Sequence, residues 1–194
     1  MGYAFRILNP EGIEMKDSTR KIVYMGMLAA LTYVATLIRF PLLGSKVHLA
    51  NSLCLLCGLL MGPVSGGLAA GLGSFLFDVT AGGYDFIQGL ITFFSKFAMA
   101  YVAGRIAWSG GRGAENRTWN AAACVAGAWT YVALYLLKTY VYQRFVYGYP
   151  VDAVWATVAA KAPASCINAV AAMVIAPILY EALKRTRPAG LANP

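Results

Sequence analysis

Long apolar stretches separated by short polar segments occupy most of this 194-residue chain. Hydrophobic residues make up 59% of the sequence and charged residues only 12%, whereas soluble domains usually carry about 25% charged residues. So few charges cannot cover the surface of a water-soluble globule. The composition therefore excludes an ordinary soluble enzyme, a disordered chain and a secreted disulfide scaffold. It predicts an integral membrane protein, with room for about five or six spans of ~20 residues.

The apolar runs and the turn residues between them predict an all-α, polytopic membrane protein, a bundle of six transmembrane helices. The expected spans are 22–40, 48–61, 64–80, 86–108, 119–142 and 153–183. Gly62 and Pro63 are expected to form a tight turn, and Pro163 or Pro177 to tilt or bend the long last span. We expect a cytoplasmic N-terminal lead-in over 1–21, a membrane domain over 22–187 and a cytoplasmic C-terminal tail over 188–194.

The distribution of basic residues predicts the orientation of the six spans. An even number of spans leaves both termini on one side, and that side holds ten of the basic residues, whereas the opposite side holds Arg39, Lys46 and Arg144. Because positive residues favour the cytoplasm, both termini are expected there. The excess of 16 basic over 8 acidic residues is then a topology signal, and no nucleic-acid partner is expected.

Lys96, Lys138 and Lys161 lie inside expected spans, all in the outer half. A lysine at the centre of a membrane helix costs about 2.5–3.5 kcal/mol, so it usually faces the protein interior or a wet cavity, or its amine extends to the interface. We interpret the three lysines as converging on an outward-facing pocket. Two alternatives stay open: structural pairing of Lys96 and Lys161 with Asp78 or Asp85, and an interfacial aromatic belt around Lys138.

Each of these lysines belongs to a polar or aromatic stripe at helical spacing. The stripes are Gln88, Thr92 and Lys96; Tyr131, Tyr135, Lys138 and Tyr142; and Lys161, Ser165 and Asn168. Span ends and outer loops add His48, Asn51, Asp78, Tyr84 and Asp85 as candidates. Such a pocket suits a small, flat, polar or anionic solute. We expect alanine at Lys96 or Lys161 to abolish solute binding while the protein still inserts; the alternative for His48 is a structural hydrogen bond.

Motifs for catalysis and for energy supply are missing. The sequence has no G-x-x-x-x-G-K-[ST] phosphate loop, and its single histidine and scarce acidic residues predict no catalytic site, metal site or cofactor. Cys54 and Cys57 lie among leucines, which favours buried thiols over a redox or zinc site. A pocket without an energy source implies an energising partner, or a channel.

Small residues form two faces along the expected helices. In the third span, Gly66-x-x-x-Ala70 and Gly67-x-x-x-Gly71 are expected to pack within the bundle, because such pairs allow helix backbones to approach closely. In the first span, Gly26, Ala29 and Ala30 form a face that either docks onto a different membrane subunit or packs internally.

The segment VHLANSLCLLCGLLMGPVSGGLAAGLGSFLFDVTAGG (47–83), followed by Lys96 and Ala103-Gly104-Arg105, resembles the substrate-binding S components of energy-coupling factor (ECF) vitamin transporters. The resemblance is closest to the riboflavin and hydroxymethylpyrimidine type. It implies a six-helix subunit of the bacterial plasma membrane that captures a water-soluble vitamin or precursor (riboflavin, a pyrimidine, pyridoxine or similar) without chemistry. It also implies docking, through the first helix, onto a membrane coupling subunit with two ABC-type ATPases. The pocket positions that it implies are His48, Asn51, Tyr84, Lys96, Lys138, Lys161 and Asn168.

Two other functions stay open. A membrane enzyme acting on a phosphorylated lipid would need a carboxylate-bound metal or a base near Lys96, for which only Asp78 and Asp85 are available. An autonomous facilitator or channel would need a polar path through spans whose inner halves are nearly all apolar. Tight binding of a vitamin without turnover would favour the S component, whereas uptake by liposomes that lack any ATPase would favour the facilitator.

Overall fold

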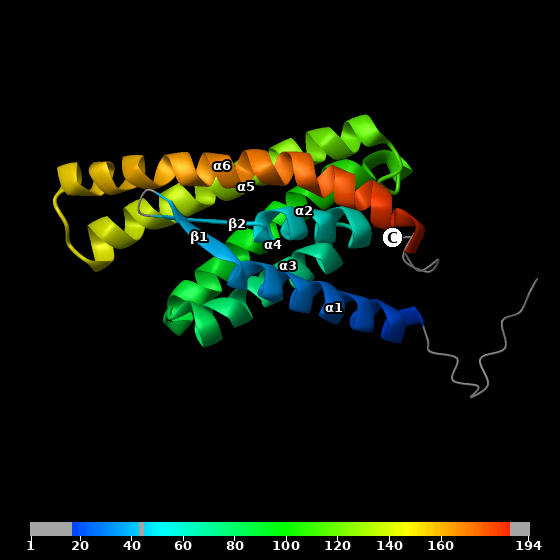
Figure 1. Ribbon diagram of the computed structural model, residues 1–194, viewed down its shortest axis with the longest axis horizontal. Coiled ribbons are helices and arrows are strands. Elements are labelled where there is room, and N and C mark those ends of the chain that lie inside the picture. The colour runs from blue at the N-terminus through cyan, green and yellow to red at the C-terminus, as the bar shows by residue number, and fades with distance from the viewer. Residues whose placement is uncertain (1–16, 43–44, 187–194) are drawn as a thin grey trace, which may run out of the picture.

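Six α-helices form a bundle in the computed structural model, which describes residues 17–42 and 45–186 (Figure 1). The expected all-α membrane bundle is confirmed. The helices are α1 (Asp17–Leu37), α2 (Ala50–Met61), α3 (Pro63–Phe77), α4 (Phe86–Trp108), α5 (Arg117–Val141) and α6 (Val151–Leu183). Short helical segments follow four of them: two π-helical turns, η1 (Asp78–Gly82) and η3 (Tyr142–Val146), and two 3₁₀ turns, η2 (Ser109–Gly111) and η4 (Lys184–Thr186).

Four of the described helices, taken with the π and 3₁₀ turns that extend them, are long and apolar enough to cross a membrane. They are Pro63–Gly82, Phe86–Gly111, Arg117–Val146 and Val151–Leu183. The second expected span is different, because the 12 residues of α2 extend only about 18 Å at 1.5 Å per residue, against a hydrocarbon core of ~30 Å. All its side chains except that of Leu53 are buried. α2 is therefore an internal helix of the bundle.

The connection between α1 and α2 departs from the expected loop. α1 ends at Leu37, so the span expected over 22–40 is too long at its C-terminal end. β1 (Arg39–Leu42) then pairs antiparallel with β2 (Ser45–His48). The second span, expected to start at His48, starts two residues later, since His48 is the last residue of β2. The hairpin was not predicted, because strands of four residues are too short to show a clear alternation of polar and apolar residues.

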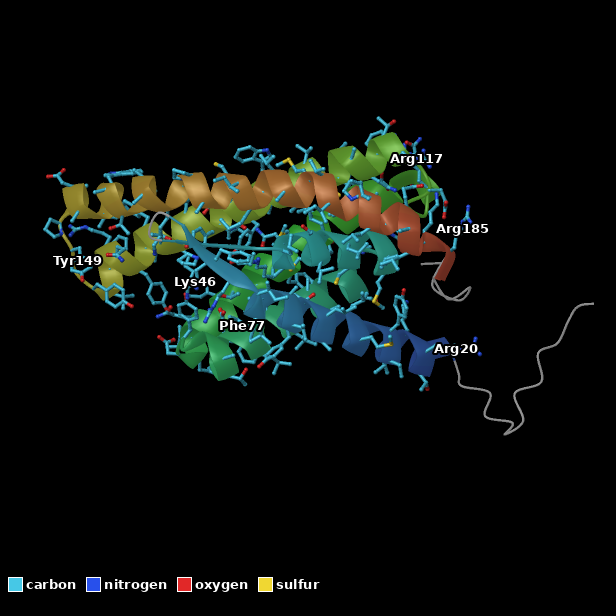
Figure 2. The ribbon with its side chains drawn as sticks, in the orientation of Figure 1. Arg20, Lys46, Phe77, Arg117, Tyr149 and Arg185 are labelled. Carbon is cyan, nitrogen blue, oxygen red and sulfur yellow. The ribbon has the colours of Figure 1, made fainter. Side chains whose placement is uncertain are left out.

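The described chain begins and ends at the same end of the bundle, while the hairpin and both π-helical turns lie at the opposite end (Figure 1). Figure 2 shows Arg20, Arg117 and Arg185 together at the first end. α1 already begins at Asp17, so it overlaps the lead-in expected over 1–21. The other residues of that lead-in (1–16), residue 187 and the tail expected over 188–194 lie outside the described residues.

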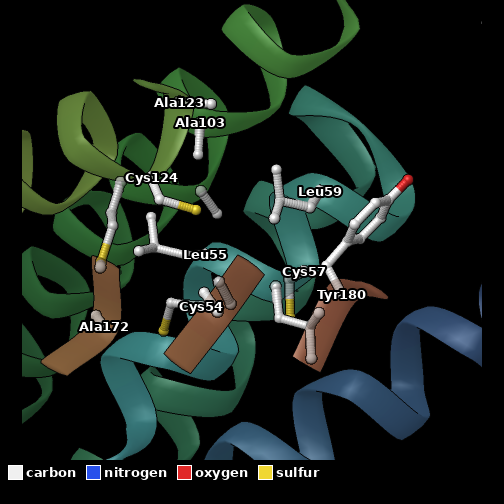
Figure 3. Packing of buried hydrophobic residues seen from close by; sticks show 14 of the residues in the cluster. Cys54, Leu55, Cys57, Leu59, Ala103, Ala123, Cys124, Ala172 and Tyr180 are labelled. Carbon is white, nitrogen blue, oxygen red and sulfur yellow. The ribbon is translucent and has the colours of Figure 1, made fainter. Parts of the chain in front are cut away.

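The core forms around α2, which contacts α1, α3, α4, α5 and α6. Cys54 and Cys57 are fully buried among leucine and alanine side chains, as free thiols (Figure 3). The expected turn after α2 is confirmed: Gly62 takes a positive φ of 77°, and Pro63 opens α3 at a position where its missing N–H costs nothing. Gly66 then allows α3 to lie directly against the backbone of α2 at Cys57 and Gly58.

Candidate functional site

A cavity of about 670 Å³ lies at the hairpin end of the bundle. Its size falls within the range of about 300–1,000 Å³ that is usual for small-molecule sites. Ten of the eleven residues expected at the site line it: His48, Asp78, Tyr84, Gln88, Lys96, Tyr135, Lys138, Lys161, Ser165 and Asn168. The eleventh, Asn51, is buried next to the cavity and contacts it through Lys96. The two π-helical turns contribute Asp78, Tyr142 and Gln143.

Lys96 forms the buried part of the cavity wall. Its side chain comes from the middle of α4, is 3% exposed, and donates a hydrogen bond to the side-chain oxygen of Asn51 on α2. Its ammonium nitrogen also lies 3.7 Å from the ring centroid of Tyr131 on α5, within the range of a cation–π contact. Lys96 therefore holds three helices together at the cavity with neutral partners.

Lys138 and Lys161 lie nearer the mouth and are only partly buried. The amine of Lys138 donates to the backbone oxygen of Gln88 and to the hydroxyl of Thr92, each at 3.3 Å. The amine of Lys161 has no hydrogen-bond or ion-pair partner among residues 17–42 and 45–186, but it lies within electrostatic range of Lys138. The structure thus brings all three lysines to one cavity from α4, α5 and α6.

The pleat of the hairpin decides which of its residues face the cavity. Arg39 pairs with His48, and Pro41 pairs with Lys46, and all four line the cavity. Phe40, on the opposite face, is exposed. Side chains alternate between the two faces of a strand, so one register supplies four lining residues.

Asn168 of α6 attaches the hairpin to the bundle. Its side-chain oxygen accepts a hydrogen bond of 2.9 Å from the backbone N–H of His48, and its side-chain nitrogen donates one of 2.8 Å to the backbone oxygen of Lys46. A single amide therefore satisfies both groups of a strand edge, as a neighbouring strand would. Asn168 was predicted to line the solute pocket. It does line the cavity, and its observed hydrogen bonds join it to the hairpin backbone.

His48 is neutral at physiological pH in this environment. Burial, reinforced by the positive charges of Lys96, Arg39 and Lys46, lowers the pKa of His48 from its ordinary value of 6.5 to about 3. Its Nδ1 atom is buried without a hydrogen-bond partner in the described structure, and so is Oε1 of Gln143. Buried polar atoms normally have a partner, so these two lining residues mark points where a bound molecule or water would complete the hydrogen bonding.

We predict that the neutral state of His48 is directly observable, because the chain has no other histidine. In ¹⁵N-histidine-labelled protein without a histidine tag, the ring nitrogens should keep neutral-imidazole shifts from about pH 8 to about pH 5. With the pKa lowered, the unfolded chain binds a proton that the native chain does not, so native stability falls as pH drops from 6.5 toward 3. A titration midpoint near the ordinary pKa would contradict this prediction.

Asp78 is the only acidic residue that lines the cavity in the described part of the chain. It is 8% exposed, lies within electrostatic range of Lys138, Lys96 and Arg39, and is close to the hydroxyl of Thr92. Its carboxylate forms no ion pair within 4 Å in residues 17–42 and 45–186; the pairs found there join Arg117 and Lys184 to Glu181 at the other end. Nor do three or more His, Cys, Asp or Glu side chains of those residues come together as a metal site.

Several lining residues lay outside the expected site. Arg39 and Lys46 were counted only as outer-side charges, and their cavity-facing position depends on the hairpin. The guanidinium carbon of Arg39 lies 5.0 Å from the ring centroid of Phe77, and the amine of Lys46 lies 5.9 Å from the ring centroid of Tyr84. Three further lining residues, Tyr131, Tyr142 and Thr92, belong to the stripes that the helical spacing had already identified.

The small face of the first helix is divided in the structure. Gly26 and Ala30 lie on the exposed side of α1, whereas Ala29 is 8% exposed and its backbone lies against α3 at Gly73. Of these three small residues, Gly26 and Ala30 are therefore accessible to another subunit and Ala29 is not.

The fold and the cavity define a class of protein: a small membrane bundle with a lysine-rich cavity beneath a hairpin. Comparisons with known proteins give the family. The sequence model of ECF-type riboflavin transporter S components matches residues 16–185, so the chain belongs to that family. Its fold is similar to a solved structure described as the S component of a bacterial ECF transporter, with a TM-score of 0.68 and 18% identity, over 87% of this chain and 98% of that one. A search of curated proteins finds no significant match.

Proposed function

We propose that this S component captures a water-soluble vitamin or vitamin precursor from outside the cell and delivers it for ATP-driven uptake. Riboflavin is the first candidate because the description of the family names it. Hydroxymethylpyrimidine and pyridoxine, which also contain flat nitrogen heterocycles, are the other candidates. The observation that carries the proposal is the cavity itself: about 670 Å³, with lysines from three helices and the hairpin over it.

Aromatic side chains support a flat solute. Tyr131 and Tyr135 stack on each other with ring centroids 6.0 Å apart and line the cavity together with Tyr84, Tyr142 and Tyr147. Aromatic walls bind planar rings through offset or edge-to-face contacts. The unpartnered polar atoms of His48 and Gln143 add hydrogen-bonding points. This combination of ring surface and a few polar groups is typical of cofactor-sized ligands.

The energy for uptake would come from a partner, because the chain contains no phosphate-binding loop. We propose a membrane coupling subunit with two ABC-type ATPases, in a bacterial plasma membrane, with both termini of this chain in the cytoplasm. Gly26 and Ala30 support the docking part of this proposal, since both small residues are exposed on α1 and would allow the backbone of another helix to approach closely there. The basic residues at the end where α1 begins support the orientation.

Calorimetric titration of the purified chain tests the capture step. We expect saturable binding of one of these vitamins at one site per chain, with the solute recovered unchanged. Vesicles that contain this chain alone should not accumulate the solute, and adding the coupling subunit, the ATPases and ATP should drive uptake. Chemical conversion of a bound molecule would indicate the membrane enzyme instead, and accumulation without an ATPase would indicate the facilitator.

A further inference from the structure

The cavity has a strongly positive lining. Five cationic side chains line it: Arg39, Lys46, Lys96, Lys138 and Lys161. The single carboxylate among the described lining residues is that of Asp78. His48 adds no charge, because it is neutral at physiological pH. The cationic groups come from five separate elements (β1, β2, α4, α5 and α6), so the arrangement depends on the tertiary fold.

No carboxylate of the described residues forms a direct ion pair with these cations. Lys96 and Lys138 bond to neutral oxygens, and Arg39 and Lys46 lie over aromatic rings. None of the five forms an ion pair within 4 Å in the described part of the chain; the ion pairs found there involve Glu181 at the opposite end. Asp85 lies within electrostatic range of Lys138, but it is exposed and does not line the cavity. Its carboxylate caps the N-terminus of α4, where it accepts hydrogen bonds from the backbone N–H and the side-chain nitrogen of Gln88.

The excess of positive charge remains under stricter counting. If the deeply buried Lys96 is left out and Asp85 is included, four cations still face two carboxylates. Charges of one sign held together in a site of low dielectric are unfavourable unless an opposite charge joins them. A neutral solute such as the ring of riboflavin would leave this excess in place. An anionic solute would remove it.

Shared neighbours connect the three less buried lysines of the cavity lining. The amines of Lys46 and Lys138 are each 5.9 Å from the ring of Tyr84, and Lys161 lies within electrostatic range of Lys138. These three side chains also keep some solvent contact, as expected for groups that meet an incoming charge. The stacked Tyr131 and Tyr135 provide ring surface in the same cavity.

We infer that the solute of this S component is an anion: a flat heteroaromatic ring that bears a phosphate or carboxylate group, with the charged group held by Lys46, Lys138 and Lys161. This inference rests on the proposed function, since it assumes that the cavity captures a solute. It narrows the substrate class from vitamins in general to their acidic or phosphorylated forms.

Matched pairs of ligands test the charge requirement on the purified full-length chain. Riboflavin against riboflavin 5′-phosphate and pyridoxal against pyridoxal 5′-phosphate compare a neutral group with a phosphate, and nicotinamide against nicotinate compares it with a carboxylate. In the pair whose ring fits, we expect the anion to bind at least about tenfold more tightly, and the ratio to shrink at high salt as the charges are screened. A preference for the anion in a phosphate pair would identify a phosphate group on the solute, and a preference for nicotinate would identify a carboxylate.

Charge-removing variants locate the anion. Lys138→Gln and Lys161→Gln should each weaken binding of the anionic member by about tenfold and change that of the neutral member much less. Arg105→Gln is the matched control, since it removes the same charge from an exposed position on α4 that does not line the cavity. The anion inference would be overturned if the wild-type chain bound the neutral member as tightly as the anionic one or more tightly, and if neither lysine variant changed these affinities. The proposed capture function would still stand in that case. If folded protein binds no member of any pair and no other vitamin, the capture function fails, and the anion inference fails with it.

Discussion

Replacing Lys96 with alanine is expected to weaken solute binding by about 10- to 150-fold, the equivalent of about 1.5–3 kcal/mol for a hydrogen bond to a charged group. The geometry gives the reason. Lys96 is 3% exposed, and its ammonium group donates to Asn51 and lies over the ring of Tyr131. Its loss therefore leaves the buried side-chain oxygen of Asn51 without this partner and removes the cation–π contact that holds Tyr131 in the cavity wall. Calorimetric titration of the wild-type ligand measures the effect.

A second substitution at the same position separates charge from volume. Lys96→Met keeps most of the side-chain volume and should lose affinity to a similar extent, because the ammonium group is absent in both variants. Arg105→Ala is the control, as an exposed cation nine residues further along the same helix. Thermal unfolding and size-exclusion profiles show whether each variant is folded. Wild-type affinity in both folded Lys96 variants would remove Lys96 from the binding site.

Replacing Gly66 with alanine is expected to lower the midpoint of thermal unfolding by about 2–12 °C, or to prevent folded protein from accumulating. A Cβ atom there would lie 2.6 Å from the carbonyl carbon of Cys57 and 2.7 Å from Cα of Gly58. Both neighbours are backbone atoms of a buried helix, so α2 and α3 would have to separate. Overpacking of this kind costs about 1–3 kcal/mol or more, and 1 kcal/mol shifts the midpoint by about 2–4 °C at this chain length.

The same substitution at Gly26 is the control for Gly66→Ala. Nothing lies within 4 Å of a Cβ atom at Gly26, and alanine favours a helix by about 1 kcal/mol over glycine. Gly26→Ala should therefore unfold at the wild-type midpoint or slightly above it. A thiol-reactive dye can report unfolding of both variants, because Cys54, Cys57 and Cys124 are buried in the folded chain. Equal midpoints for the two variants would contradict the close helix contact at Gly66.

Much of the site was predictable because burying a charge in a membrane is costly wherever the residue lies in the fold. That argument identified Lys96, Lys138 and Lys161, and helical spacing then identified Gln88, Ser165 and their neighbours on the same faces. The same local rules predicted the turn at Gly62 and Pro63 and the limits of α4 (Phe86–Trp108). These features depend on composition and on periods within one segment.

Features that depend on contacts between distant segments were not predictable. Asn168 of α6, some 120 residues away, binds the hairpin, and contacts with Phe77 and Tyr84 accompany Arg39 and Lys46 in the lining. Ala29, expected on a docking surface, is buried because α3 packs there.

The amino-acid sequence alone determined that the chain lies in a membrane, that it forms helices, and which segments carry polar groups too costly to leave in lipid. Only the tertiary structure decided that α2 is an internal helix and that five cations from five elements share one cavity with a single carboxylate among the described lining residues. The reason is physical. The cost of placing a side chain in lipid belongs to that residue and its segment, whereas the surroundings of a charge depend on which segments pack next to it.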